Sequence, residues 1–155
     1  MMMEERQVQS AIELRKSDLL RLRWVLATRQ RIGLYADDYE LLREEIDRAR
    51  IVDDDALAST VVAIGSTAIV LDPGSGEYGK YTLVLPPQGD IARLRVSVLA
   101  PLGTALLGSS VGDVIEWQMS GGSRRLRIEA VRHGKEANGL SVPAASSMQR
   151  ILRSR

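Results

Sequence analysis

The hydrophobic residues of this chain change their spacing near residue 60, and the change predicts two parts with different secondary structure. Before that point the apolar positions recur every three or four residues, as they do on one face of a helix. They form two runs on either side of Gly33: Leu14, Leu19, Leu22 and Leu26, then Leu42, Ile46 and Ala49. The spacing predicts a helix over residues 16–29, with a start as early as Ala11, and a second helix that ends near Arg50. A short turn between them makes an antiparallel helical hairpin.

After residue 60, apolar and polar residues alternate with a period of two, which predicts strands rich in Val, Ile and Leu. The expected strands are residues 60–64, 67–71, 80–85, 94–99, 113–119 and 125–131, with hairpin turns at residues 73–76 and 120–123. Between Pro101 and Gly108 a short helix is expected, because Pro suits the first position of a helix and Gly its end. The fold class is therefore α+β, a helical hairpin followed by an antiparallel sheet packed on one short helix.

These patterns divide the chain into three segments. Residues 1–55 form the predicted N-terminal hairpin and residues 56–133 the predicted C-terminal domain. Residues 134–155 are rich in Gly, Ser and Ala and carry Arg150, Arg153 and Arg155 near their end, so they are expected to form a flexible basic tail. The hairpin is too small to bury a core alone, so we expect it to lean on the C-terminal domain or to project from it.

The composition of the 155 residues, 45% hydrophobic and 26% charged, is typical of a globular domain. The chain has no cysteine and one histidine, which excludes a disulfide framework and cysteine-ligated zinc. No apolar run has the roughly 18 residues of a membrane span, and the first residues lack a signal-peptide core. The net charge of +1 is too small to indicate nucleic-acid binding. We therefore expect a cytoplasmic protein that uses no cofactor, no metal and no membrane attachment.

Acidic residues near the predicted turn of the hairpin are the main candidates for chemistry. Asp37, Asp38 and Glu40 offer the oxygen ligands that Mg²⁺ prefers. They also suit the N-cap and first turn of a helix, where carboxylates complement the helix dipole, and we favour this second interpretation. His133 is interpreted as an exposed turn residue and not as a catalytic base. Because no catalytic constellation is evident, the sequence favours a binding module over an enzyme.

The stretch from Ser97 to Trp117, SVLAPLGTALLGSSVGDVIEW, together with the following Gly121-Gly122, resembles the C-terminal domain of the GreA/GreB transcription elongation factors. It is most similar to the Rnk type, named regulators of nucleoside diphosphate kinase. Upstream, the Ser17-Asp18-Leu19 and Tyr81-Thr82-Leu83-Val84 segments also match. The resemblance covers about residues 16–132 and leaves the first fifteen residues and the tail outside it.

The resemblance implies an FKBP-like C-terminal domain that docks at the rim of the RNA polymerase secondary channel, and a coiled-coil hairpin that enters the channel. It implies a docking surface around Ser97, Pro101 and Leu102. Gre factors carry an acidic residue two positions before the motif proline, where this chain has Leu99. Long Gre hairpins place two tip carboxylates beside the catalytic Mg²⁺ and stimulate cleavage of backtracked RNA. Here an arm of about 14 residues spans only roughly 21 Å.

The resemblance thus favours a monomeric, non-enzymatic transcription regulator that binds RNA polymerase without stimulating cleavage. Nucleic acid would be met only indirectly, through the transcription complex. The alternatives are a transcript-cleavage elongation factor and an FKBP-like peptidyl-prolyl isomerase. Active isomerases line their pocket with aromatic side chains, and this domain offers only Tyr78, Tyr81 and Trp117. Control of nucleoside diphosphate kinase rests on the family name alone.

Overall fold

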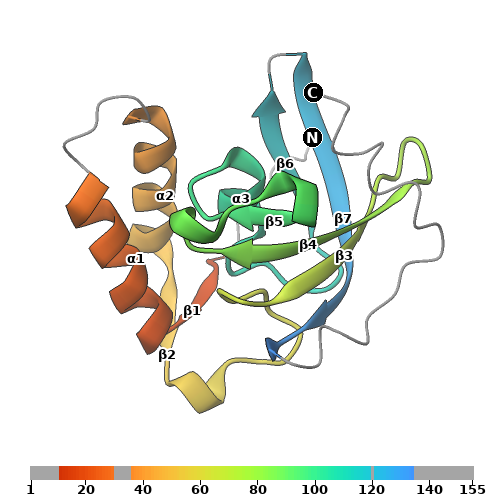
Figure 1. The fold of residues 1–155 in the computed structure, drawn as a ribbon. Coiled ribbons are helices and arrows are strands. Elements are labelled where there is room, and N and C mark those ends of the chain that lie inside the picture. Colours follow the sequence, from red (N-terminus) through yellow and green to blue (C-terminus); the bar gives the residue numbers. More distant parts are fainter. Residues whose placement is uncertain (1–10, 30–35, 120, 135–155) are drawn as a thin grey trace, which may run out of the picture.

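The computed structural model describes residues 11–29, 36–119 and 121–134, which form a helical hairpin beside a curled sheet (Figure 1). The helices are α1 (Lys16–Arg29), α2 (Ala36–Arg48) and α3 (Pro101–Leu106). The strands are β1 (Glu13–Arg15), β2 (Arg50–Val52), β3 (Thr67–Leu71), β4 (Tyr78–Val84), β5 (Arg95–Ser97), β6 (Val114–Met119) and β7 (Gly122–Arg132). The mixed α+β class is as expected. The predicted tail lies outside the described residues, apart from Gly134.

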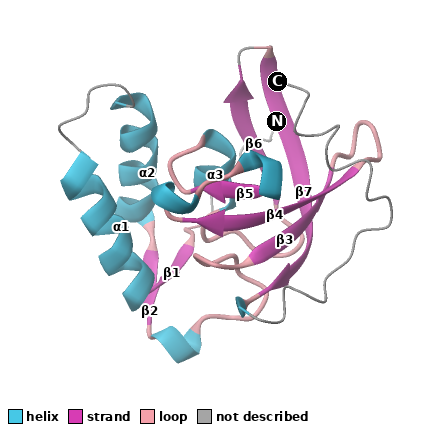
Figure 2. Cartoon of the chain, in the orientation of Figure 1, coloured by secondary structure: helices cyan, strands magenta, loops and turns pink. Residues whose placement is uncertain are grey.

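The two predicted helices are present and run alongside each other in opposite directions (Figure 2). The helical start as early as Ala11 is wrong, because residues 13–15 are extended. They pair in parallel with β2, with Leu14 opposite Ile51. The second helix ends at Arg48, two residues before its expected end. This small parallel pair ties the two ends of the hairpin together at its base.

Acidic residues that follow β2 stabilise the first turn of α1. The Asp54 carboxylate accepts a hydrogen bond from the backbone N–H of Ser17 at 3.1 Å, and Lys16 pairs with Asp53 at 2.8 Å. The N–H of Ser17 holds the pKa of the Asp54 carboxyl below its usual value. The hydrogen bond and charge of Asp53 raise the pKa of Lys16. Residues from opposite ends of the hairpin thus meet at the helix start, where negative charge is favourable.

Asp54→Ala is expected to lower the melting temperature slightly at neutral pH, because the exposed N–H of Ser17 loses its anionic acceptor. The lowered pKa means that the carboxylate stabilises the fold above its unfolded-state pKa, and that this contribution disappears as the pH falls through the folded-state value. The difference in melting temperature between wild type and variant should therefore shrink in acid. A difference that stays constant down to the lowest pH measured would show that the carboxylate charge is not involved.

The larger sheet has five strands in the order β5-β4-β3-β7-β6. Three of its neighbouring pairs are antiparallel, as predicted, but β4 and β5 are parallel, so the expectation of a purely antiparallel sheet is wrong at this edge. The chain between them makes short 3-10 turns at Pro86–Gln88 and Ile91–Arg93, which return it to Thr82, so that β5 pairs with the second half of β4. The strand expected at residues 60–64 is also wrong: this segment makes a single bridge, between Val61 and Ser110.

Helix α3 lies against the sheet as its sequence predicts. Pro101 occupies its first position, and Gly108 follows its end with φ = +76°, a left-handed conformation that suits glycine. The buried hydroxyl of Thr104 donates a hydrogen bond to the carbonyl of Val98 at 2.7 Å. Leu106 and Leu107 are fully buried in a hydrophobic core that also includes Leu22 and Leu42 of the hairpin. The hairpin therefore leans on the sheet domain, and the proposed division at residue 55 crosses one continuous core.

Candidate docking surface

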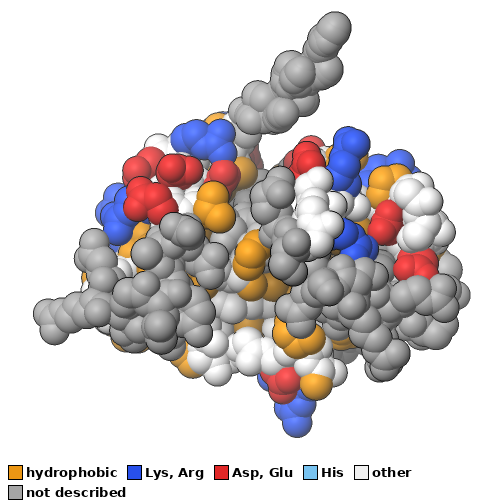
Figure 3. Space-filling model, turned by 90° about the horizontal axis from the view of Figure 1, so that it is seen from above, with side chains coloured by type: hydrophobic (Ala, Val, Ile, Leu, Met, Phe, Trp, Pro, Cys, Tyr) orange, Lys and Arg blue, Asp and Glu red, His pale blue; other side chains and the backbone are white. Residues whose placement is uncertain are grey.

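A broad groove separates the hairpin from the outer strand of the sheet. It has a volume of about 1340 Å³ and is lined by residues of β1, α2, α3, β6 and β7, and of the segments that include Ala11, Val61 and Ser110. Viewed from above, hydrophobic side chains lie along the middle of this face, with charged side chains on both sides (Figure 3). The groove thus brings together elements that are far apart in the sequence.

The groove walls offer apolar contact area. Leu41 of α2 and Val114 of β6 line it and are each 47% exposed, and Trp117 is half-buried beside them. Glu45 and Arg125 supply charges of both signs to the lining. Exposed apolar side chains in a hollow with a polar rim are typical of protein-binding surfaces. The lining of the groove is therefore typical of a surface that binds another protein. Among the described residues, no group of three or more His, Asp or Glu side chains could hold a metal ion.

The three residues predicted to dock do not lie together on this surface. Pro101 is exposed and lines the groove at the start of α3. Leu102 is only 9% exposed and belongs to the hydrophobic core, as does Leu99. Ser97 is half-buried at the end of β5, where its hydroxyl accepts a hydrogen bond from the N–H of Leu99 at 3.0 Å. A docking role for these residues remains a prediction, and Pro101 is the one of the three that lines the groove.

The predicted tip acids lie at the beginning of α2. Because that helix starts at Ala36, Asp37 and Asp38 belong to its first turn and are not N-cap residues, and their side chains lie outside the described part of the structure. Glu40 is exposed one turn further along. The backbone placement fits the interpretation that these acids complement the helix dipole.

The family model for the C-terminal domain of transcription elongation factor GreA/GreB matches residues 57–133, which include the whole larger sheet and α3. The chain is 35% identical over 108 residues to transcription elongation factor GreA of Rhodospirillum rubrum, over 70% of this chain and 69% of the relative. The chain belongs to the GreA/GreB family.

Two further likenesses support this membership. The chain is 34% identical over 101 residues to the regulator of nucleoside diphosphate kinase of Escherichia coli K12, covering 64% of this chain and 74% of the relative. The solved structure of a prokaryotic transcription elongation factor GreA/GreB from Nitrosomonas europaea aligns with a TM-score of 0.68 and 36% identity, covering 79% of this chain and 99% of that one. The resemblance recognised from the Ser97–Trp117 segment is confirmed.

In this GreA/GreB-family chain, a buried carboxylate that the sequence analysis missed joins the hairpin to the sheet domain. Asp18 is 0% exposed. It accepts hydrogen bonds from Arg15 at 3.0 Å, from Arg21 at 2.9 Å and from the backbone N–H of Ile64 at 3.3 Å. The spacing of the two arginines, three residues before and three after the acid, was the available signal.

His133, which the sequence predicts as an exposed turn residue, uses both ring nitrogens in contacts with other residues. Its Nδ1 lies 2.8 Å from the Ser66 hydroxyl, and its Nε2 lies 3.2 Å from the carbonyl oxygen of Ser59. The Ser66 hydroxyl also accepts the N–H of Ala63 at 2.9 Å. The His133 side chain therefore holds the loop at Ser59 close to Ser66, which directly precedes β3, and this is a structural role.

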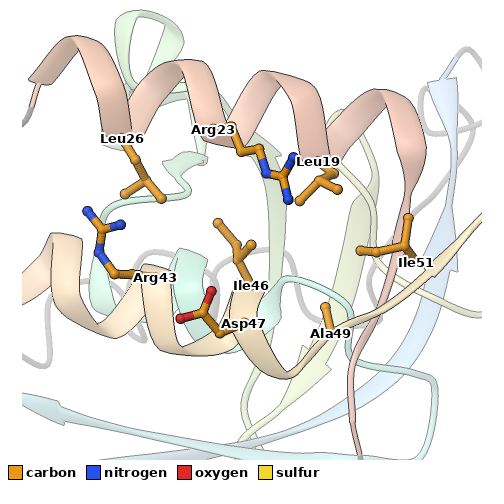
Figure 4. Close-up of a pocket in the computed structure, with 8 residues that line it drawn as sticks. All are labelled: Leu19, Arg23, Leu26, Arg43, Ile46, Asp47, Ala49 and Ile51. Atoms are coloured by element: carbon orange, nitrogen blue, oxygen red, sulfur yellow. The ribbon is translucent and has the colours of Figure 1, made fainter.

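A second, smaller hollow of about 310 Å³ lies between α1 and α2 (Figure 4). Leu26 and Ile46 form part of its floor, while Arg23 and Arg43 extend into it from opposite helices.

None of the helices that the structure describes is both long enough and apolar enough to cross a membrane.

Proposed function

We propose that this protein is a transcription regulator of the Gre/Rnk type that binds RNA polymerase at its secondary channel and does not stimulate transcript cleavage. In this proposal the larger sheet and α3 correspond to the FKBP-like docking domain of Gre factors. Helices α1 and α2 correspond to their coiled-coil hairpin. Family membership supports the partner, and the groove lined by Leu41, Pro101 and Val114 is the proposed docking surface.

The short length of the hairpin supports the proposal that the protein does not stimulate transcript cleavage. Its helices have 14 and 13 residues, so at 1.5 Å per residue each arm is roughly 21 Å long. The hairpin also shares its core with α3 and the sheet instead of standing free of them. A short hairpin held against the docking domain leaves its tip near the channel entrance. A carboxylate there is too far from a buried catalytic Mg²⁺ to act on it, since the Debye length is about 8 Å.

Binding without catalysis is the simplest role for these residues. An isomerase pocket needs accessible aromatic side chains, but Tyr81 is only 1% exposed and lies in the core. Trp117 is the aromatic side chain that lines the groove among the described residues. The function proposed here is therefore occupancy of a polymerase surface, in competition with other factors that use the same entrance.

The proposal is tested with stalled, backtracked elongation complexes. The protein alone should leave the transcript uncleaved, and an excess of it should inhibit cleavage stimulated by an added Gre factor. The double variant Leu41→Ser with Val114→Ser should lose this inhibition, because two exposed apolar contacts are removed from the groove. Ile91→Ser is the matched control, since Ile91 is 40% exposed and does not line the groove.

Two results would contradict the proposal. If the protein does not bind core RNA polymerase, the partner is wrong. If it cleaves transcripts alone and Asp37→Ala with Asp38→Ala abolishes the activity, the tip acids are catalytic and the argument from hairpin length fails.

A further inference from the structure

The hollow between α1 and α2 has an apolar floor and an arginine toward each end (Figure 4). Leu26 and Ile46, which line it, are buried, and its α1 wall from Leu19 to Leu26 is roughly 10 Å long. In Figure 4 the guanidinium of Arg43 lies beside Leu26, at one end. The guanidinium of Arg23 lies toward Leu19, at the other end, so that apolar Ile46 separates the two positive groups.

Neither arginine is neutralised by a described carboxylate. In the same helix as Arg23, Arg21 pairs with buried Asp18 at 2.9 Å. By contrast, the side chains of Arg23 and Arg43 form no ion pair or hydrogen bond with another residue that the structure describes. Arg43 is nevertheless half-buried, and a guanidinium that loses water without gaining an acceptor is unfavourable. An oxyanion at each end of the hollow would supply that acceptor, since arginine binds carboxylates and phosphates through paired N–H donors.

Asp47 determines where in the hollow an anion is favourable. It lines the α2 wall four residues after Arg43, and Figure 4 shows its carboxylate beside Ile46, between the two guanidiniums. A negative group at the centre of the hollow is repelled by this carboxylate, whereas one at either end lies closer to an arginine. The lining therefore favours a ligand whose two negative groups are separated by an uncharged body over one compact anion.

We propose that the hollow between α1 and α2 binds a small organic dianion, with one oxyanion on Arg23, the other on Arg43, and the carbon body against Leu26 and Ile46. Dicarboxylates and bisphosphates share this chemistry. The volume of about 310 Å³ is at the lower end of the roughly 300–1,000 Å³ of small-molecule sites, so the ligand is small. A bound dianion would link the two helices of the hairpin. The site is separate from the groove, and binding to it does not depend on the proposed function.

The test titrates the full chain with adipate, a linear dicarboxylate, by isothermal calorimetry. Adipate should bind saturably, one per chain, and should raise the melting temperature. Hexanoate has the same carbon chain with a single carboxylate and should bind at least about tenfold more weakly, because it engages one arginine. Succinate is too short to reach both ends and should also bind more weakly. A parallel titration with 1,6-hexanediol bisphosphate shows whether the site prefers phosphates to carboxylates.

Charge-removing variants locate the binding. Arg23→Gln and Arg43→Gln should each weaken adipate binding at least about tenfold and abolish the preference over hexanoate. Arg95→Gln is the matched control, because Arg95 is exposed on β5 and does not line the hollow. Asp47→Asn should strengthen the binding of hexanoate, since the repulsive carboxylate is removed. Melting temperatures without ligand should stay close to the wild-type value, because these side chains are exposed or half-buried.

Three results would overturn the inference. The first is that neither adipate nor the bisphosphate binds saturably. The second is an equal loss of affinity in Arg23→Gln and Arg95→Gln, which would indicate attraction to surface charge alone. The third is equal affinity for adipate and hexanoate, which would show that two separated charges are not recognised. None of these measurements contains RNA polymerase, so failure here leaves the proposed function standing, and failure of polymerase binding leaves this site standing.

Discussion

Gly103→Ala is expected to lower the melting temperature by roughly 10 °C, which corresponds to at least about 3 kcal/mol for a chain of this size. A Cβ atom at this position would lie 1.8 Å from the carbonyl oxygen of Ser97 and 2.7 Å from its carbonyl carbon. Both contacts are with backbone at the end of β5, so no side chain can move aside. Helix propensity favours Ala over Gly by only about 1 kcal/mol, and the clash outweighs it.

Gly121→Ala provides the control for this prediction. No heavy atom lies within 4 Å of the Cβ that it would add. Its melting temperature should therefore remain close to the wild-type value, as measured by circular dichroism or calorimetry. Equal melting temperatures for the two variants would mean that α3 is not packed against the end of β5, and would also remove the structural basis for placing Pro101 at the groove.

Asp18→Ala is the second substitution with a large expected effect, about 3 kcal/mol of unfolding free energy. The variant removes the buried acceptor of two arginines and leaves the N–H of Ile64 without its side-chain partner. The estimate is at the lower end for a broken buried pair, because Arg15 and Arg21 are 24% and 49% exposed and can turn to water. The free energies of unfolding of the wild type and the variant are measured by chemical denaturation.

The matched comparison for Asp18 is Asp53→Ala. Asp53 pairs with Lys16, but both side chains are about two-thirds exposed, at 67% and 68%. Exposed pairs of this kind contribute little to stability because water screens their charges, so the loss should be small. Similar losses for the two variants would show that burial of the Asp18 carboxylate has no energetic consequence.

The sequence was sufficient for elements that depend on local periodicity. Both hairpin helices follow from the spacing of apolar residues, α3 follows from the Pro at its start and the Gly after its end, and β3 and β7 follow from alternation. The parallel pair of β1 and β2 could not be predicted, because each strand has three residues and its partner is more than thirty residues away. Likewise, the direction of β5 relative to β4 depends on two 3-10 turns and not on the pattern within either strand.

The candidate site was less predictable than the fold. The motif that contains Ser97, Pro101 and Leu102 includes one residue that lines the groove, Pro101, but it could not show which side chains are accessible. In the short helix α3, exposed Pro101 and buried Leu102 are consecutive residues. The groove itself could not be found from any one segment, because its walls come from α2, α3 and β6.

The position of β7 has a consequence for how the chain reaches this structure. It pairs with β3 on one side and β6 on the other, and it joins Thr67 to Arg132 across more than sixty residues. Contacts of such long range form late, whereas the hairpin and the β3–β4 ribbon can form early. Until β7 is synthesised, β3 presents an open edge of backbone donors and acceptors beside apolar Ala68 and Val70. A chain interrupted within β7 would therefore tend to aggregate through this edge and not persist as a smaller folded domain.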